Sequence, residues 1–337
     1  MFRKNVFRVT PDSGVPLIGC IAFGIIDRGT NLVQVRPISG CNLNCIFCSV
    51  DEGPYSRTRV TRYLVDLDYL LEYCGWIAEF KGHRKLEFHI DCAGDPVTYP
   101  YLVELVQGLS EIRGVEVVSM QTHGVGLTEK LVDELADAGL SRINLSIDAL
   151  NPDLARKLAG LNSYRVDRVL ELAEYIVANE KIDLLVAPVW VPGYNDAEIE
   201  PIIRWALKIG AGGRWPPLGI QKYVPHKHGR KPPGCKPMTW GEFYSKLRRL
   251  EKRYGVKLVL SPSDFGIHRR KMVPVVFEKG ERVTVKVVAP GWVVGEKIGV
   301  CKGRCITIVD ASQVEIGAKI KVTVIENKHN IYIGKVE

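Results

Sequence analysis

Three cysteines lie close together in the sequence, at Cys41, Cys45 and Cys48, directly after the apolar run from Asn31 to Ser39. Their C-x3-C-x2-C spacing brings three thiolates into one short loop, and soft sulfur is the ligand that iron clusters prefer. Three thiolates can hold three irons of a [4Fe–4S] cluster and leave the fourth iron open. An open iron can bind and polarise a small molecule, by the logic that separates open catalytic metal sites from closed structural ones.

Two other interpretations of these cysteines remain. The loop could supply three ligands of a zinc site whose fourth ligand is remote, although the paired C-x2-C knuckles typical of zinc sites are absent. A disulfide framework is the second interpretation. The nine cysteines are an odd number, and no apolar signal segment follows Met1, so we expect a cytoplasmic protein.

Three further polar segments follow predicted strands. They are Cys92–Pro96 with Gly94 and Asp95, Gln121–Gly124 with Thr122 and His123, and Asn144–Ala149 with Ser146 and Asp148. In a parallel α/β barrel the site lies at the C-terminal ends of the strands, which makes these side chains candidates. Structural roles stay open for them: a simple turn after Cys92, a hydrogen-bonding role for His123, and a helix cap for Asp148.

Together these segments resemble the radical S-adenosylmethionine (SAM) enzymes, over roughly residues 31 to 265. Phe47, just before the last cysteine, fits the family's cluster loop. Cys92-Ala93-Gly94-Asp95-Pro96 resembles its Gly-Gly-Glu-Pro motif, with Ala93 and Asp95 as departures. The resemblance implies a [4Fe–4S] cluster on Cys41, Cys45 and Cys48, SAM on the open iron, its cleavage to methionine and a 5'-deoxyadenosyl radical, and an electron donor such as a ferredoxin or flavodoxin.

The resemblance also implies which residues surround SAM. Thr122 stands in a Thr-Asn-Gly-like segment in which His123 replaces asparagine, Pro192 begins a Pro-Gly-x-Asn-Asp turn, and Ile220 belongs to the strand that lines the adenine pocket. The implied cofactor-binding residues are Phe47, Gly94, Asp95, Thr122, Ser146, Asp148, Pro192 and Ile220. Candidate catalytic residues are His123, as a titratable group, and the thiols of Cys92 and Cys235, since radical enzymes often use a further thiol.

Alternating strands and helices must position these residues. The apolar spacing predicts strands at 85–92, 115–121, 142–147, 182–191 and 219–223, and helices at 66–80, 99–111, 128–138, 151–158, 166–178, 196–209 and 239–254. This pattern predicts an α/β fold with a parallel sheet. About six repeats rather than eight indicate an open, partial (β/α)6 TIM-like barrel, the fold that the resemblance also implies.

The two ends of the chain differ from this pattern. Apolar runs at 15–26 and 32–38, separated by Asp27-Arg28-Gly29-Thr30, predict a β-hairpin, and Asp51–Arg62 is expected to be a surface loop. Short Val- and Ile-rich runs with glycine breaks from Pro274 predict a small all-β barrel. The domain boundaries that we expect are an N-terminal extension at 1–30, a radical SAM core at 31–270 and the barrel at 274–337.

The C-terminal segment resembles the TRAM domain, an RNA-binding β-barrel of several RNA-modifying enzymes. Lys and Arg outnumber Asp and Glu there, and the whole chain has a net charge of +8, which suits an anionic partner. Two functions follow: radical modification of a base in tRNA or rRNA, or radical modification of a protein side chain or small metabolite, with the barrel as an interaction module. No run is long and apolar enough for a membrane span, so no membrane partner is expected.

Overall fold

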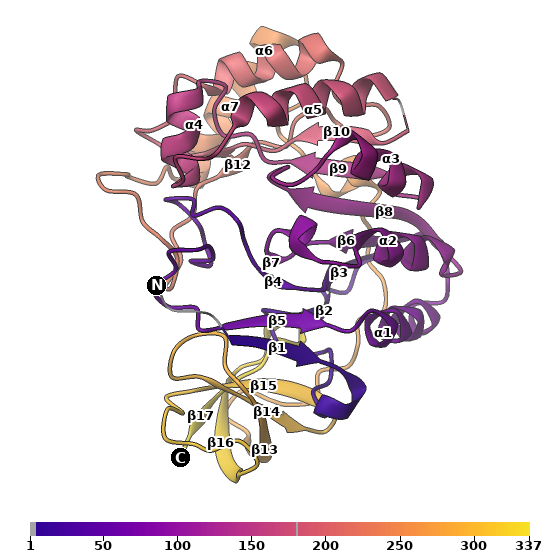
Figure 1. Ribbon diagram of the computed structural model, residues 1–337, viewed down its shortest axis with the longest axis vertical. Coiled ribbons are helices and arrows are strands. Elements are labelled where there is room, and N and C mark those ends of the chain that lie inside the picture. The colour runs from indigo at the N-terminus through magenta and orange to yellow at the C-terminus, as the bar shows by residue number, and fades with distance from the viewer. Residues whose placement is uncertain (1–4, 180) are drawn as a thin grey trace. The chain divides into compact units, whose positions relative to one another are not determined.

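The computed structural model describes residues 5–179 and 181–337. The chain forms two compact units. Unit 1 contains the described residues of Met1–Gly40 together with Ser56–Val118 and His268–Glu337, and unit 2 contains Cys41–Tyr55 and Ser119–Ile267. Figure 1 labels most of the helices and strands of both.

Unit 1 contains the first strands of the α/β pattern. Strands β2 (Gly24–Asp27) and β3 (Leu32–Arg36) are antiparallel, and β3 is parallel to β6 (Leu86–Ile90). The hairpin predicted around residues 27–30 is therefore confirmed. Gly29 there adopts a positive φ of 75°, a conformation that glycine reaches without steric cost.

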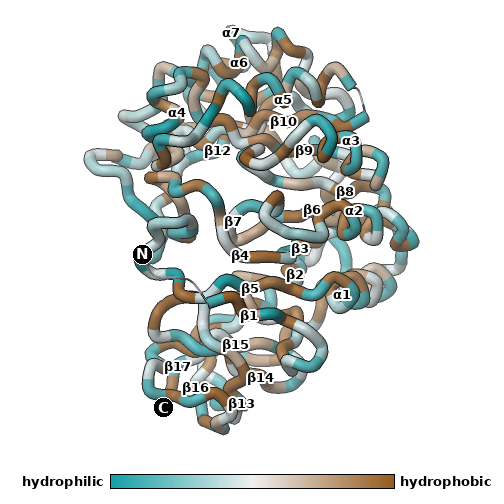
Figure 2. The backbone as a smooth tube through the Cα atoms, in the orientation of Figure 1, coloured by the Kyte–Doolittle hydropathy of each residue, from teal (hydrophilic) through white to brown (hydrophobic). Residues whose placement is uncertain are grey.

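Helices α1 (Leu67–Phe80) and α2 (Leu102–Glu111) also belong to unit 1. The Asp66 carboxylate caps α1 by accepting a hydrogen bond from Tyr69 N–H. One face of α1 is buried through Leu70, Cys74, Ile77 and Ala78, and hydrophobic and hydrophilic residues accordingly mix along α1 in Figure 2. Both helices confirm the predicted spans, although α2 begins later because a 3-10 turn, Pro96–Thr98, precedes it.

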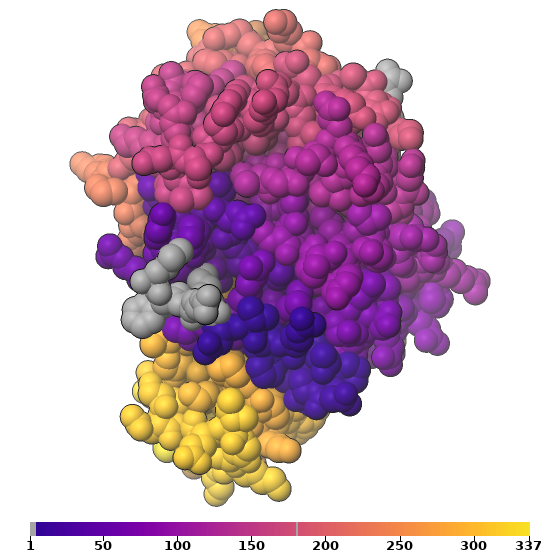
Figure 3. Space-filling view, viewed as in Figure 1, coloured from indigo at the N-terminus to yellow at the C-terminus, as the bar shows by residue number. Residues whose placement is uncertain are grey.

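The N-terminal segment differs from the prediction. Strand β1 (Asn5–Val9) is parallel to β5 (Thr61–Val65), and the predicted strand at 15–26 is wrong except for β2. Apart from Ile21, which is exposed, its remaining residues are buried, and the segment contacts the C-terminal barrel: Cys305 N–H donates to Ile18 O, and Tyr332 N–H donates to Gly19 O. Figure 3 shows the N-terminal segment, in indigo, against the yellow barrel.

The predicted C-terminal barrel is confirmed. Five strands close in the order β13-β14-β15-β17-β16, namely β13 (Arg282–Pro290), β14 (Lys297–Cys301), β15 (Arg304–Val309), β16 (Lys319–Glu326) and β17 (Ile333–Val336). Along β13, exposed Arg282, Thr284 and Lys286 alternate with buried valines, as the two-residue period of a strand requires. Phe277 and Tyr332 pack edge to face in the barrel core at 5.0 Å between centroids.

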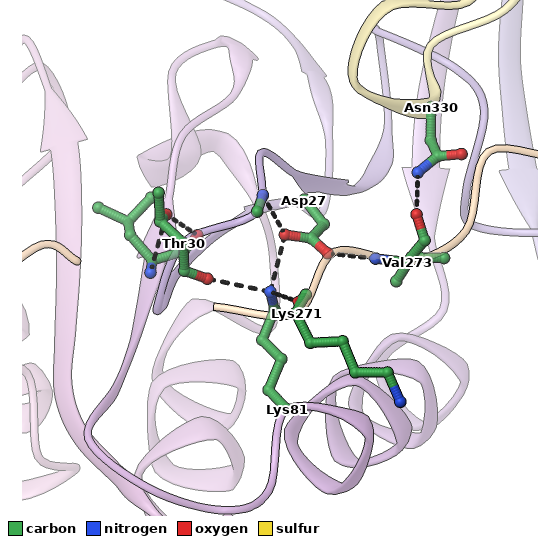
Figure 4. Close-up of polar contacts among 8 residues, drawn as sticks. Asp27, Thr30, Lys81, Lys271, Val273 and Asn330 are labelled. Atoms are coloured by element: carbon green, nitrogen blue, oxygen red, sulfur yellow. Dashed lines mark hydrogen bonds and ion pairs between the residues drawn. The ribbon is translucent and has the colours of Figure 1, made fainter. Parts of the chain in front are cut away.

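The segment that leads into the barrel is fixed by a buried ion pair within unit 1 (Figure 4). Lys81 Nζ lies 2.8 Å from Asp27 Oδ1 and also donates to Thr30 O and Lys271 O. Asp27 Oδ2 accepts from Val273 N–H at 2.8 Å. The basic segment before the barrel is therefore bound to unit 1 by several hydrogen bonds.

Unit 2 contains the end of β8 (Val115–Thr122), which is parallel to β9 (Arg142–Leu145), which in turn is parallel to β10 (Asp183–Val186). Short strands β11 (Val189–Trp190) and β12 (Gln221–Lys222) are also parallel to each other. Its helices are α3 (Glu129–Asp137), α4 (Pro152–Ala159), α5 (Val166–Asn179), α6 (Ile199–Ile209) and α7 (Trp240–Tyr254). The predicted α/β class is confirmed, and the strand predicted at 182–191 is two short strands separated around Pro188.

The prediction of a surface loop at 51–62 is wrong in part. Asp51 and Glu52 are buried in unit 2, and Arg59 is buried in unit 1. Arg59 lies 3.7 Å from the centroid of the Trp292 ring, a cation–π contact. The charged residues of this segment predicted a surface loop. They are buried instead, because their partners come from distant parts of the chain.

Two short parallel strands, β4 (Ser39–Gly40) and β7 (Ala93–Gly94), complete unit 1. Gly94 has a φ of 150°, and a Cβ atom there would lie 1.8 Å from Gly40 O. No residue with a side chain fits this close approach of the two backbones.

Candidate functional site

The loop with the three cysteines belongs to unit 2. It is held to the C-terminal end of α4, since Asn44 N–H donates to Ala159 O and Ile46 N–H donates to Leu158 O, each at 2.9 Å. Gly160 ends α4 with a φ of 63°, and a Cβ atom there would lie 2.1 Å from Asn44 O. Glycine at this helix end is therefore what lets the loop approach the helix.

Arg230 also binds this loop, from the segment between β12 and α7. Its guanidinium donates to Cys45 O at 2.6 Å, to Glu52 O at 2.6 Å and to Asp51 Oδ1 at 2.8 Å, and it reaches Asn44 Oδ1 at 3.2 Å. Its backbone N–H donates to Cys48 O at 2.8 Å. One side chain thus holds both ends of the cysteine loop, and no motif in the sequence pointed to it.

The three thiols lie within electrostatic reach of one another. Burial, and then the charges of Asp148, Cys41 and Cys48, raise the pKa of Cys45 well above its usual value, while Arg230 lowers it. Among residues 5–179 and 181–337, no three His, Cys, Asp or Glu side chains converge on a single metal ion. In a [4Fe–4S] cluster each thiolate binds a different iron, so three thiols on one loop fit the cluster without surrounding one point.

Four of the predicted side chains lie at the ends of β8 and β9. Thr122 is buried, and its Oγ1 accepts from Gly124 N–H at 3.0 Å. Ser146 N–H donates to Thr122 O, and Ser146 Oγ accepts from Gln121 Nε2 at 2.8 Å. His123 and Asp148 line one small cavity together with Cys45. The structure therefore brings these predicted residues together beside a predicted cluster cysteine.

Asp148 is half-buried in unit 2. Its Oδ1 accepts from Val189 N–H at 2.8 Å, and its carbonyl accepts from Asn195 Nδ2 at 2.9 Å. Burial raises the pKa of the Asp148 carboxyl, and His123 and the Val189 N–H partly offset that effect. The start of α4 is capped by a different residue, Asn151, whose side chain accepts from the first N–H groups of that helix.

The turn that contains Pro192 is fixed by Asn195. This fully buried amide donates to Val189 O at 2.9 Å and accepts from Val191 N–H at 2.8 Å. Pro192 is half-buried, and Gly193 has a φ of 81°. Asn195 therefore stabilises the predicted Pro-Gly-x-Asn-Asp turn through its own hydrogen bonds.

Phe47, Ile220 and Cys235 are the other predicted residues in unit 2. Phe47 and Ile220 are buried, at 7% exposure each, and Cys235 is half-buried. Burial, followed by the charge of Asp196, raises the pKa of the Cys235 thiol. This thiol is therefore mainly protonated at neutral pH.

The predicted residues Cys92, Gly94 and Asp95 belong to unit 1. Burial is the main reason that the pKa of Cys92 lies well above its usual value. Asp95 is buried and caps the 3-10 turn after it, with Oδ1 accepting from Val97 N–H at 3.1 Å. The turn expected at this segment is present, and the Asp95 carboxylate already has a structural partner.

The remaining cysteines form no disulfide anywhere in the described chain. The disulfide framework, which was the second interpretation of the cysteine pattern, is therefore not formed by the described residues. Cys301 is opposite Arg304, and Cys305 is opposite Val300, so the two cysteines are on opposite faces of the β14–β15 hairpin. Cys305 is buried and donates to Pro16 O at 3.0 Å.

Comparison with known proteins identifies the family. The Radical SAM superfamily matches residues 35–206, which are 172 of the 337 residues. An uncharacterized protein of Methanocaldococcus jannaschii is 44% identical over 99% of this chain and 81% of its own length. The GTP 3',8-cyclase of Alkaliphilus metalliredigens is 29% identical over 51% of this chain and 51% of its own, so the match spans about half of that enzyme.

Solved structures share the fold at low sequence identity. HydG of Carboxydothermus hydrogenoformans, a maturase of the FeFe-hydrogenase, has a TM-score of 0.53 at 15% identity, with 66% of this chain and 52% of that chain covered. SuiB of Streptococcus suis has a TM-score of 0.51 at 16% identity, with 67% and 47% covered. Across the described residues, no helix has both the length and the apolar character to cross a bilayer.

Proposed function

We propose that this chain, which belongs to the radical SAM superfamily and is an enzyme with a [4Fe–4S] cluster and SAM as cofactors, modifies a base in RNA, namely in tRNA or rRNA. When bound, the cofactors supply hydrogen-atom abstraction from the substrate. The chain's own part is to hold the cofactors and to bind and position the RNA. The compartment in this proposal is the cytoplasm, with a ferredoxin or flavodoxin as electron donor.

In this proposal the cofactors bind at the cysteine loop and at the residues that match the family's motifs. Cys41, Cys45 and Cys48 hold the cluster, and Arg230 fixes the loop that presents them. The SAM contacts in this proposal are Phe47, Gly94, Asp95, Thr122, Ser146, Asp148, Pro192 and Ile220. For the catalytic roles proposed for His123, Cys92 and Cys235, the two cysteines supply neutral thiols, since burial raises the pKa of both.

One observation favours RNA over a protein or metabolite substrate. On the outer face of the barrel, Lys286 of β13 is directly opposite Lys319 of β16, and Lys321 is opposite Thr284. All three lysines are exposed, and none has an ion-pair partner among the described residues. Like charges directly opposite in a sheet are destabilising, so this cluster has a cost that a bound polyanion offsets. We call it the lysine face.

The lysine face differs from the other lysines of the same barrel. Lys279 pairs with Glu326, Lys302 with Glu281 and Lys335 with Asp310. These paired lysines provide a control with the same number of charges in the same fold.

The test compares two triple variants of the full chain. K286Q/K319Q/K321Q should weaken binding of a single-stranded oligoribonucleotide and reduce the slope of log K against log salt by about 0.7 for each phosphate that is no longer neutralised, so by up to about 2. K279Q/K302Q/K335Q removes as much charge and should change the slope much less. RNA binding without salt dependence, or equal effects of the two variants, would contradict the proposal and favour a protein or metabolite substrate.

A further inference from the structure

A second cavity in unit 2 lies apart from the cysteine loop. Its volume is about 440 Å³, within the range of small-molecule sites. Its walls come from the ends of β8, β9 and β10, from β12, from α7 and from the segment after α7. The residues that matter for recognition are Gln121, Asn144, Ile220, Lys222, Trp240 and Tyr244.

Two amide side chains stand side by side in this cavity. Gln121 of β8 and Asn144 of β9 are direct partners in the parallel ladder, and both are half-buried. Each has one end of its amide fixed by a neighbour. Gln121 Nε2 donates to Ser146 Oγ at 2.8 Å, and Asn144 Oδ1 accepts from Arg142 Nε at 2.9 Å.

These hydrogen bonds orient the two amides in different ways. Arg142 can only donate, so its bond fixes Asn144 with Nδ2 as the remaining donor. The Ser146 hydroxyl can donate or accept, and with Gln121 Nε2 donating to it, as the structure has it, Gln121 Oε1 is the remaining acceptor. An acceptor next to a donor complements a planar heterocycle that carries a donor and an acceptor side by side, as the Watson–Crick edge of a nucleobase does.

Aromatic rings form another wall of the cavity. Trp240 and Tyr244 of α7 are stacked, with centroids 5.8 Å apart and an interplanar angle of 24°. Trp240 is 56% exposed, so a flat ligand can contact the part of its ring that neither Tyr244 nor Lys222 covers. Aromatic platforms of this kind bind bases of any sequence by stacking.

The charges around the cavity narrow the ligand further. The described residues that line it include Lys222 but no Asp or Glu. Lys222 Nζ lies 5.0 Å from the centroid of Trp240. The lining therefore suits a neutral or anionic ligand such as a nucleotide, and it offers no counter-ion to the ammonium group of a lysine side chain or amine metabolite.

The cavity also adjoins the predicted SAM contacts. Ile220 lines it directly, and Gln121 is bonded to Ser146. A substrate site must meet this condition, because a radical acts only on an atom held close to it.

We propose that this cavity is the substrate site and that it takes an unstacked nucleobase, with its polar edge on Gln121 and Asn144 and its ring against Trp240. This inference rests on the proposed function, because it takes the nucleobase to be part of RNA. Unstacking is required because enzymes that act on a base take it out of the stack.

Two variants test the recognition. N144D keeps the oxygen that accepts from Arg142 and replaces the free donor with an acceptor, whereas W240L removes the stacking surface. Arg248, exposed on α7 and not part of the cavity wall, provides the control R248Q. Thermal unfolding of each variant shows whether it is folded.

The probes are the four ribonucleoside 5'-monophosphates, titrated one at a time by calorimetry into the reconstituted enzyme with SAM. At least one should bind, N144D and W240L should each weaken that binding about tenfold or more, and R248Q should leave it within about twofold. If no monophosphate binds, or if folded N144D and W240L bind as the parent does, the inference is wrong.

The result separates this inference from the proposed function. Salt-dependent RNA binding on the lysine face, with no nucleotide binding in the cavity, overturns the inference and leaves the RNA proposal standing. Nucleotide binding that depends on Asn144 and Trp240, without salt-dependent RNA binding, supports the cavity assignment and overturns the RNA proposal in favour of a nucleotide metabolite.

Discussion

The loop that carries the three cysteines depends on Arg230, and its removal is the sharpest test of how that loop is held. The side chain of Arg230 is 18% exposed, and that of its partner Asp51 is 7% exposed. Breaking a buried ion pair by removing one partner costs about 3–5 kcal/mol. Arg230 is only partly enclosed, so we expect R230M to lower the free energy of unfolding by about 3 kcal/mol, at the lower end of that range.

The same change should reduce cluster incorporation. The Arg230 guanidinium holds Cys45 O and Glu52 O as well as Asp51, so R230M removes these contacts and keeps the backbone hydrogen bonds of Asn44, Ile46 and Cys48. The assay is urea unfolding of the apoprotein, together with the iron content after anaerobic reconstitution. R230K keeps the charge but loses the planar fork, and should lie between R230M and the parent.

A double variant shows whether the ion pair itself is responsible. In R230M/D51N the unpaired charge is gone, so the loss of stability should be smaller than in R230M alone. If R230M unfolds within about 0.5 kcal/mol of the parent and binds as much iron, Arg230 does not hold the loop, because a surface side chain without a structural role behaves that way.

Three further results are expected. K81M should destabilise the protein by about 3–5 kcal/mol in urea unfolding, because it leaves Asp27 buried without its ammonium partner. D27N/K81M should recover part of that loss, and equal free energies of unfolding for the two variants would exclude the ion pair as the cause. C45A should lose most of the iron, about four per chain in the parent, and the broad visible absorbance of the cluster, and a retained cluster would contradict its assignment as a ligand. D148N keeps an oxygen for Val189 N–H but removes the charge, and should weaken SAM binding about tenfold with the cluster intact; unchanged affinity would assign Asp148 to structure alone.

Local patterns predicted the helices and most strands well. Helix α7 shows why: Thr239 and Glu242 form a capping box at one end, and Gly255 ends the helix in the left-handed conformation. Such signals lie within the element itself and need no knowledge of the tertiary structure. The barrel was predictable for the same reason, because the alternation along β13 is visible in the sequence.

Predictions failed where the cause of a pattern lies far away in the chain. The apolar residues before β2 predicted a strand, but they are buried because their backbone bonds to Cys305 and Tyr332 of the barrel. Asp51 and Glu52 predicted a surface loop, but Arg230 lies 179 residues from Asp51. No local pattern in the Arg230 segment indicates that interaction.

The site was predicted in part. Motif spacing predicted Thr122, Ser146 and Asp148 as site residues, and all three lie in unit 2, where Ser146 N–H bonds to Thr122 O and Asp148 lines the cavity beside Cys45. The sequence did not single out Gln121, directly before Thr122, or Asn144, two residues before Ser146. An amide within a strand has no local feature that separates it from other half-buried residues. Only the register of β8 with β9 shows that these two amides are neighbours.

The cysteine loop owes its order to contacts within unit 2, although the strands at both of its ends, β4 and β5, belong to unit 1. Residues 41–55 contribute no strand of their own, so their backbone groups need partners from elsewhere. Those partners are the end of α4 and the side chain of Arg230, each of which binds main-chain atoms rather than the thiols. Neither of these contacts uses a cysteine sulfur, so the loop can be ordered before the cluster is bound.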